Sequence, residues 1–536
     1  MTLTGWLIFF LVVQVVHFLC TWKMYVAAGR KAWEAGVPVY NAVILMKIIN
    51  RPWWWVILLF VPIVNLIMLP VVWVETLRSF GYNTSKDTFL GVITFGLYIG
   101  YVNYTQKLEY IKDRSLKPRT SAGEWTSSIL FAVVAATIVH TYFMQPFTIP
   151  TSSLEKTLLV GDYLFVSKFH YGARTPMTSA ALPMVHDRIP FTKAKSYYSG
   201  LEYPYFRLPG FQDIKHNDIV VFSWPIDEFV DIGPPATGYM YKPIDKKSNY
   251  VKRCVALPGD SLQVKNGYVF INGKQNELPD RAKLQFAYEV LSNTPLAILD
   301  AKGRNTGNPI PFMAEKYEIS DIHVTDLDDK GIYKHTAFIT AETAEKLKSD
   351  FTSVTLIEGV EGQWSKDTFP KNAQYPWNND FFGPIYIPKA GVTVAINSES
   401  IPFYKRIIEV YEGSELGIEN SITQSGTSVL LNGQPLTEYT FKMDYYWMMG
   451  DNRSNSQDAR TWGYVPFNHV VGKPVFVWLS LDKNKSWFSK IRWNRMFTTV
   501  GGDGEPVSYL KYFLIALGGW FLFSFFRKKK RKKTTK

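Results

Sequence analysis

The chain changes character at Phe147-Thr-Ile-Pro-Thr-Ser-Ser-Leu-Glu-Lys-Thr-Leu-Leu-Val-Gly-Asp162, a stretch that follows an apolar run from Trp125 to Met144. About 20 apolar residues suffice to cross a bilayer, so the run predicts a transmembrane helix that ends just before the stretch. Ser153, within the stretch, would ordinarily belong to a polar turn after such a helix. Any chemical role for this serine therefore depends on what the rest of the chain contains.

Residues 147–500 consist of short β-branched and aromatic runs separated by Gly, Asn, Asp and Pro. Such runs occur at residues 219–222, 268–271, 392–396 and 428–431. Asn-Gly pairs, which favour the tight turns of β-hairpins, stand at residues 266–267, 272–273 and 432–433. Helical pattern is scarce in this segment, which therefore predicts a mostly β domain.

Five apolar runs of about 17 to 23 residues predict about five membrane spans. The runs cover residues 3–22, 52–74, 88–104, 125–144 and 507–526. Pro62 and Pro70 interrupt the second run, and the third is short and contains Gly91, Gly96 and Gly100. For these two runs, the alternative interpretation is a hairpin that enters the membrane and returns on the same side.

Basic residues beside the runs predict the orientation, because cytoplasmic loops are enriched in Lys and Arg. Residues 23–51 and 105–124 each contain five such residues and are expected in the cytoplasm. The loop at residues 75–87 contains two basic and two acidic residues, which is consistent with the outer side. Five crossings then place residues 145–506 outside the cell and the C-terminal tail inside.

The net charge of +13 does not indicate a nucleic-acid partner, because eight positive charges lie in the last ten residues and only +5 remains elsewhere. A short basic tail after an apolar run is typical of a cytoplasmic anchor that can also contact anionic lipids. Cys20 and Cys254 lie far apart and form neither a disulfide framework nor a zinc motif. The eight histidines show no metal-binding spacing, so we expect no metal and no cofactor.

Two later segments contain the remaining distinctive motifs. Residues 250–260 read Tyr-Val-Lys-Arg-Cys-Val-Ala-Leu-Pro-Gly-Asp, and residues 450–460 read Gly-Asp-Asn-Arg-Ser-Asn-Ser-Gln-Asp-Ala-Arg. With the boxes at 149–158 and 161–172, the chain resembles the bacterial type I signal peptidases in four ordered boxes. These are membrane-bound serine proteases that remove signal peptides from exported proteins. The resemblance implies a mostly β catalytic domain of signal-peptidase type, here with a β-rich insertion and α-helical transmembrane segments.

The resemblance implies that Ser153 is the nucleophile and Lys252 its general base. Lysine takes a proton from serine only when its pKa falls well below about 10.4, and burial lowers this pKa because the ammonium group loses water. Apolar neighbours of Lys252, such as Tyr250 and Val251, would supply that environment. The resemblance also implies an oxyanion hole formed by the backbone N–H of Ser153 and the hydroxyl of Thr151.

Supporting and substrate-binding residues are implied in the same way. Ser456 is expected to orient the lysine amine, and Asp458 and Arg460 are expected to form a structural ion pair. The family cleaves after Ala-x-Ala in an extended substrate, which would pair with an exposed strand edge. The walls of the small pockets correspond to apolar positions that would equally suit an ordinary core, namely Phe147, Ile149, Pro150, Leu154, Leu158, Tyr250 and Val251.

Six positions depart from the family pattern, namely Ser152, Leu154, Lys156, Ala256, Ser454 and Ala459. Ser152 replaces the usual glycine, which adds a second hydroxyl beside the proposed nucleophile and restricts the backbone. The segment from Ser153 to Lys156 also matches the S-x-x-K pattern of penicillin-binding proteins and class A β-lactamases. The K-T-G and S-D-N motifs of those proteins are absent from the sequence, so Lys252 is the better candidate base.

The resulting expectation is a multi-pass signal peptidase I of the bacterial plasma membrane, with its catalytic domain on the extracytoplasmic side. Its partners would be the signal peptides of secreted preproteins, the lipid bilayer and the secretion translocon. The expected domains are a membrane module at 1–124, a transmembrane helix at 125–146, a peptidase domain at 147–500 with an insertion around 280–440, a second transmembrane helix at 507–526 and a basic tail at 527–536. Alternatives are a Ser/Lys membrane protease with a narrower substrate, and an inactive relative that binds envelope proteins.

Overall fold

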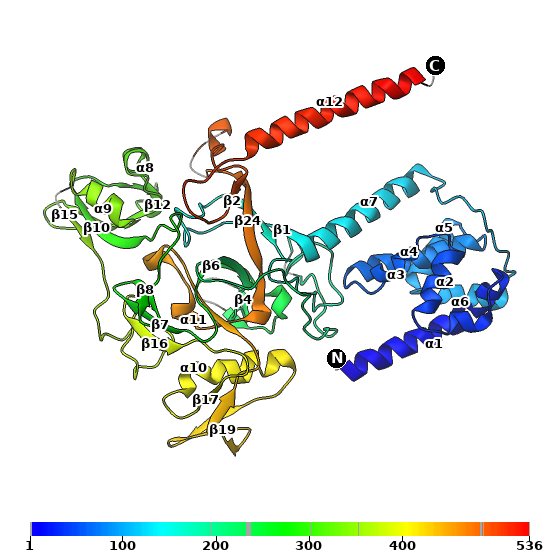
Figure 1. Ribbon diagram of the computed structural model, residues 1–536, viewed down its shortest axis with the longest axis horizontal. Helices are drawn as coiled ribbons and strands as arrows, with labels where there is room; N and C mark the ends of the chain where they lie inside the picture. Colours follow the sequence, from blue (N-terminus) through cyan, green and yellow to red (C-terminus); the bar gives the residue numbers. More distant parts are fainter. Residues whose placement is uncertain are drawn as a thin grey trace. The chain divides into compact units, whose positions relative to one another are not determined.

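The computed structural model describes residues 3–534, except 193, 232–236, 301, 352, 483–484 and 486 (Figure 1). The chain divides into two units. The first unit contains residues 1–143, 174–208 and 229–247, and the second contains residues 144–173, 209–228 and 248–536. The first unit is mainly helical in its N-terminal part, and the second is mainly β.

The first unit begins with α1 (Leu3–Ala27), an apolar helix of 25 residues. The α-helices that follow are α2 (Tyr40–Ile48), α3 (Trp55–Leu58), α4 (Val64–Ser79), α5 (Ser85–Ile93), α6 (Leu97–Thr105) and α7 (Ser121–Ile138). A core among α1, α2, α4 and α6 contains Met24, Ile44, Val72 and Ile99. The later parts of this unit contain isolated β-bridges and a short hairpin of β4 (Phe229–Asp231) and β5 (Thr237–Tyr239).

Three helices in the described part of the chain are long and apolar enough to cross a membrane, and they are Thr4–Ala27, Ser121–Phe143 and Leu510–Arg527. The last of these is the apolar part of α12 (Leu510–Thr534), and the tail side chains beyond residue 527 lie outside the described part. The predicted spans at 52–74 and 88–104 are each divided between two helices of 16 residues or fewer, where about 20 are needed. The prediction of five spans is therefore not confirmed, and the structure supports three.

The second unit is built on an eight-stranded sheet with the order β1-β2-β24-β3-β6-β22-β23, in which β25 also pairs with β24. Its strands are β1 (Met144–Thr148), β2 (Asp162–Ser167), β3 (Ile219–Ser223), β6 (Asn249–Ala256), β22 (Tyr445–Met449), β23 (Val465–Pro466), β24 (Val470–Ser480) and β25 (Thr498–Thr499). All pairs in this sheet are antiparallel. The sheet confirms the predicted mostly β domain, and it unites the strands next to which all four sequence boxes lie.

The region predicted as one insertion, residues 280–440, contains two differently packed parts. Four strands of its first part form a separate sheet with its own apolar core: β10 (Phe286–Ser292), β13 (Ile322–Leu327), β14 (Tyr333–Ile339) and β15 (Ser353–Leu356). The short helices α8 (Pro311–Lys316) and α9 (Ala341–Leu347) contribute Met313 and Leu347 to that core. In the second part, β16 (Phe382–Tyr386) pairs with β7 (Ser261–Lys265), and Phe382 shares a core with Trp447 of β22.

The three Asn-Gly pairs lie at hairpin turns, as predicted. They connect β7 to β8 (Tyr268–Ile271), β8 to β9 (Lys274–Gln275), and β19 (Ser428–Leu431) to β20 (Gln434–Pro435). The asparagines have φ between 50° and 52°, and the glycines have φ between 74° and 83°. Positive φ at both positions is the type I′ conformation, whose twist matches that of the strands it joins.

Candidate active site

Ser153 and Lys252 are far apart in the sequence and meet in the second unit. Ser153 lies in the turns between β1 and β2, and Lys252 lies on β6, which runs between β3 and β22. The Nζ of Lys252 is 2.5 Å from the Oγ of Ser153, across 99 positions of sequence. Both side chains are buried, with 7% of Ser153 and 3% of Lys252 exposed. This geometry allows the amine to accept the proton of the serine hydroxyl.

The surroundings of Lys252 lower its pKa to about 8. The main cause is burial, which deprives the ammonium group of water. The charge of Arg460 acts in the same direction, whereas the carboxylates of Asp458 and Asp451 act against it. With this pKa, an appreciable fraction of the amine is neutral near neutral pH, as a general base requires.

The two groups expected to form the oxyanion hole are free to bind a ligand. Within the described part of the chain, neither the N–H of Ser153 nor the hydroxyl of Thr151 has a hydrogen-bond partner. Thr151 is exposed to solvent. The carbonyl oxygen of Ser153, by contrast, accepts a hydrogen bond of 3.1 Å from the N–H of Asn452, which ties this turn to the segment after β22.

Ser456 lies against the same turn, but its hydroxyl makes no hydrogen bond to Lys252. Its Oγ is buried and has no partner among the described residues. A Cβ added to Gly450 would lie 2.3 Å from this Oγ and 2.6 Å from the carbonyl oxygen of Ser153. Gly450 therefore allows a close approach that no other residue would permit, and an orienting role of Ser456 stays a prediction.

Asp458 and Arg460 form the expected ion pair, which confirms that prediction of contact. Nε and Nη2 of Arg460 donate to the two carboxylate oxygens of Asp458 at 2.9 and 2.8 Å. The pair is buried, and it is possible at a spacing of two because the short helix α11 (Ala459–Trp462) begins directly after Asp458. Burial alone would raise the pKa of Asp458, but Arg460 and the N–H of Gly450 bring this pKa below its ordinary value.

A second buried ion pair was not identified in the sequence. Nε and Nη2 of Arg253 donate to Asp451 at 2.7 and 2.6 Å, and the hydroxyl of Thr157 donates to Asp451 at 2.7 Å. Burial alone would raise the pKa of Asp451, but Arg253 holds this pKa below its ordinary value. Arg253 directly follows Lys252, so the pair connects the lysine strand to the turn that carries Ser153. The sequence signal was that Arg253 and Asp451 each lie in one of the quoted boxes, at residues 250–260 and 450–460.

Most of the predicted substrate-binding positions share one apolar cluster. Ile149, Leu154 and Leu158 are buried in it, and Phe147 and Val251 pack against it. Tyr250 lies elsewhere, stacked on Trp224 at 5.1 Å, because successive residues of a strand point to opposite faces of the sheet. Pro150 is exposed.

The insertion contacts the turn that carries Ser153. The side-chain amide of Asn455 donates to the hydroxyl of Ser152 at 3.2 Å and to Asp321, just before β13, at 2.7 Å. Nζ of Lys156 donates to the carbonyl oxygen of Glu318 at 2.6 Å. Ser152 and Lys156 are two of the six departures from the family pattern. Each forms a hydrogen bond to a residue that is distant in the sequence.

Two family models match this chain. The model described as signal peptidase, peptidase S26, matches residues 122–317 and 389–479, which is more than half of the chain. The unmatched stretch at 318–388 includes three of the four strands of the separate sheet in the insertion. A family of unknown function, DUF5684, matches residues 33–113.

Curated relatives are similar in sequence to most of this chain. The signal peptidase I of Buchnera aphidicola subsp. Acyrthosiphon pisum is 25% identical over 370 residues, which cover 68% of this chain and 77% of the relative. The signal peptidase I of Haemophilus influenzae is 22% identical over 403 residues (72% and 78%), and that of Helicobacter pylori is 24% identical over 389 residues (70% and 92%). The chain therefore belongs to the signal peptidase family, peptidase S26, and is a serine endopeptidase.

Proposed function

We propose that this protein is a signal peptidase I that uses Ser153 as nucleophile and Lys252 as general base to release signal peptides from exported preproteins. The observation that carries the proposal is the 2.5 Å contact between Oγ of Ser153 and Nζ of a buried lysine whose pKa is lowered to about 8. An intact pair of this kind argues against the alternative of an inactive relative.

In the proposed reaction, neutral Lys252 takes the hydroxyl proton of Ser153 while Oγ bonds to the carbonyl carbon of the scissile peptide. The N–H of Ser153 and the hydroxyl of Thr151 stabilise the negative charge on the carbonyl oxygen. As the C–N bond breaks, Lys252 gives the proton to the leaving amine. Water then attacks the ester, Lys252 takes a proton from that water, and Oγ of Ser153 recovers it when the acid leaves.

We propose that the substrate binds as an extended strand and is cleaved after Ala-x-Ala. Strand β1 supports this mode of binding, since among the described strands it pairs only with β2, which leaves its other edge open shortly before Ser153. An extended peptide can add to such an edge through backbone hydrogen bonds. The apolar residues Ile149, Leu154 and Leu158 lie next to this strand and would form the walls of pockets for small side chains.

The test is cleavage of a purified preprotein by the full-length protein in detergent. A preprotein with Ala-x-Ala should be cut at one bond, and a matched preprotein in which leucine replaces the alanine before that bond should be cut at least about tenfold more slowly. Cutting of only one membrane substrate among several preproteins would favour a protease of narrower specificity. Failure to cut any of them would contradict the proposed function.

The rate of cleavage should rise with pH. Only neutral Lys252 acts as a base, and its pKa of about 8 leaves about one-tenth of it neutral at pH 7. We expect kcat/KM to increase about tenfold between pH 7 and pH 9 and then to level off, as measured with the same preprotein in buffers of constant ionic strength. A rate that falls between pH 7 and pH 8.5 would contradict the assignment of Lys252.

We propose that the protein acts in the bacterial plasma membrane on substrates delivered by the secretion translocon. Helix α7 supports this setting, because it is one of the three apolar helices and ends six residues before β1 begins. The proposed extracytoplasmic location of residues 145–506 follows from the basic loops and the basic tail.

A further inference from the structure

The N-terminal module contains two apolar runs that do not form continuous helices. The helix is interrupted between α3 and α4 in residues 52–74, and between α5 and α6 in residues 88–104. The chain reverses in each run, because Arg51 contacts Glu75 and Tyr82 contacts Lys107. Phe60 lies at the first reversal with 52% of its surface exposed, and Phe95 lies at the second with 80% exposed. Large apolar residues at two exposed turns are unusual in water and are typical of a surface that contacts lipid.

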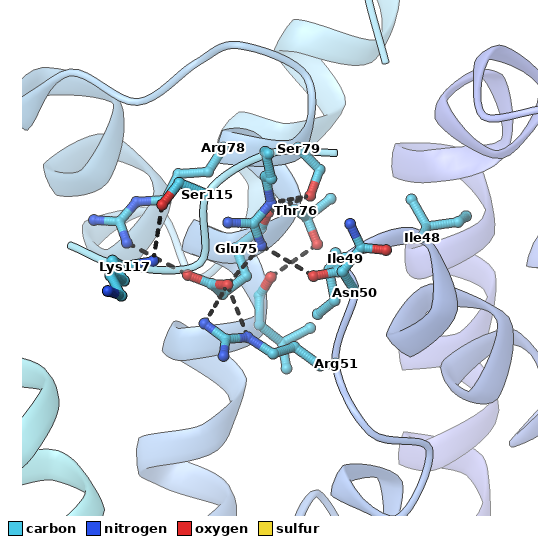
Figure 2. Close-up of polar contacts among 12 residues, drawn as sticks. Ile48, Ile49, Asn50, Arg51, Glu75, Thr76, Arg78, Ser79, Ser115 and Lys117 are labelled. Atoms are coloured by element: carbon cyan, nitrogen blue, oxygen red, sulfur yellow. Dashed lines mark hydrogen bonds and ion pairs between the residues drawn. The ribbon is translucent and has the colours of Figure 1, made fainter. Parts of the chain in front are cut away.

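The two ends of the first run are joined by an ion-pair cluster, which Figure 2 shows around Glu75. Arg51 directly precedes the run, and its Nε and Nη2 donate to Oε2 of Glu75 at 3.0 and 2.8 Å. Arg114, from the loop before α7, donates to the same oxygen at 2.6 Å. Nη1 of Arg78 lies 3.4 Å from Oε1. The residues before and after the run therefore lie close together, and in a bilayer they would lie at the same depth.

The two ends of the second run also contact one another, here through hydrogen bonds. The hydroxyl of Tyr82, before α5, donates to the carbonyl oxygen of Lys107, after α6, at 3.0 Å. Nη1 of Arg119 donates to Oδ1 of Asn83 at 2.8 Å. The loop between the two runs thus contacts the loop that precedes α7. The hydrocarbon core of a bilayer is about 30 Å thick, so these two loops cannot lie on opposite sides of it.

We propose that residues 52–105 form two re-entrant hairpins that enter the bilayer from the cytoplasmic side and return to it. The acyl chains of the lipids cover the exposed apolar residues of the hairpins, chiefly Ile57, Phe60, Phe89, Ile93, Phe95 and Leu97. The chain then crosses the membrane three times, through α1, α7 and α12. Replacing two crossings by hairpins leaves the side of residues 145–506 unchanged.

Charge supports the side from which the hairpins enter. Three arginines surround the single carboxylate of Glu75, so the common base of the hairpins carries excess positive charge. Cytoplasmic loops are enriched in basic residues, and the anionic lipids of that leaflet attract them. The cluster thus has two functions: it fixes the ends of the first hairpin, and it keeps the base of the module among the headgroups.

Labelling of single cysteines tests the proposal in full-length protein. Lys86→Cys places an exposed thiol in the first turn of α5, at the base of the second hairpin. Asp113→Cys marks the loop before α7, and Glu361→Cys marks the peptidase unit. A membrane-impermeant maleimide is added to intact spheroplasts and to inverted vesicles. The protein without added cysteines is the background control, because Cys20 is half-buried and Cys254 is buried.

Lys86→Cys and Asp113→Cys should both be labelled at least tenfold more in inverted vesicles than in spheroplasts. Glu361→Cys should be labelled more in spheroplasts than in inverted vesicles. Reaction of Lys86→Cys together with Glu361→Cys would restore the five-span arrangement and overturn the proposal. Phe60→Cys and Phe95→Cys should react from neither side. A fast reaction at either turn would show that it lies in water and would overturn the lipid contact.

A separate observation concerns the insertion, and it rests on the proposed function. We infer that Asp321 and Asn455 are positioning residues for the turn that carries Ser153. The amide of Asn455 connects the hydroxyl of Ser152 with Asp321, whose side chain is 17% exposed. Ser152 is adjacent to the nucleophile, so this bridge limits the movement of Oγ relative to Nζ of Lys252. The insertion thereby anchors, through Ser152, a turn whose backbone would otherwise be held mainly by Asn452.

A double-mutant cycle tests this inference. Asp321→Ala and Ser152→Gly should each lower kcat about fivefold, without changing KM or the pH at which the rate levels off. The kcat of the double variant should be no lower than that of either single variant. The matched control is Asp326→Ala, which removes a 62% exposed carboxylate from β13, the strand that follows Asp321. It should leave kcat unchanged. Additive effects, or no effect of Asp321→Ala, would overturn the positioning role, whereas absence of cleavage by the unmodified protein would instead overturn the proposed function.

Discussion

Replacing Lys252 by alanine should lower kcat/KM for preprotein cleavage by at least about 10³-fold while the protein stays folded. Nζ of Lys252 is the one basic group in hydrogen-bond contact with Oγ of Ser153 within the described part of the chain. Alanine leaves the hydroxyl proton without an acceptor. The fold should survive because the variant removes a buried amine rather than leaving a buried charge without its partner. Single-turnover cleavage by the detergent-solubilised protein measures the effect.

Lys156→Ala is the matched control, because it removes the other lysine near Ser153. Nζ of Lys156 is engaged by the carbonyl oxygen of Glu318, so its loss should change kcat/KM by no more than about threefold. If Lys156→Ala abolished cleavage and Lys252→Ala did not, the S-x-x-K interpretation would replace the proposed one. Thermal unfolding of each variant distinguishes lost chemistry from a lost fold.

Ser153 and Lys252 could be predicted together because each lies in a short box that resembles a box of the type I signal peptidases. The hairpin turns at the Asn-Gly pairs were predictable from the sequence itself, since positive φ at two successive residues is a local property. The ion pair of Asp458 and Arg460 also lies within one box. The hairpin turns and this ion pair need no information about which distant segments meet, whereas the contact between Ser153 and Lys252 was implied by the family resemblance alone.

The unpredicted features all depend on contacts between distant segments. Asp321 and Asn455 are 134 positions apart, and no sequence pattern around either residue predicts the contact between them. The two broken membrane spans have the same explanation. Hydropathy counts apolar residues but does not register where the chain reverses, and only the contact between Arg51 and Glu75 reveals that the first run returns to its starting depth.

Replacing Arg253 by alanine should lower the free energy of unfolding by about 3 to 5 kcal/mol. The variant leaves the carboxylate of Asp451 buried with the hydroxyl of Thr157 but without the guanidinium that forms its ion pair. The matched control is Arg304→Ala, which breaks an ion pair with Asp300 in which the arginine is 71% exposed, and it should cost less than about 1 kcal/mol. Denaturant unfolding of the full chain in detergent measures both changes. Equal small losses would show that the buried pair contributes little.

The pH dependence separates the loss of the charge partner from a simple loss of packing. Arg253 holds the pKa of Asp451 below its ordinary value, so this carboxylate stabilises the fold above about pH 4 and ceases to do so as the pH falls through the depressed pKa. Without Arg253, burial is opposed only by the hydroxyl of Thr157 and the charge of Arg453, so the pKa of Asp451 rises. The loss of stability in Arg253→Ala should therefore be greatest near neutral pH and should shrink as the pH falls and Asp451 becomes protonated. The double variant Arg253→Met, Asp451→Leu should recover most of the stability, because an apolar pair of similar volume leaves no buried charge unpaired.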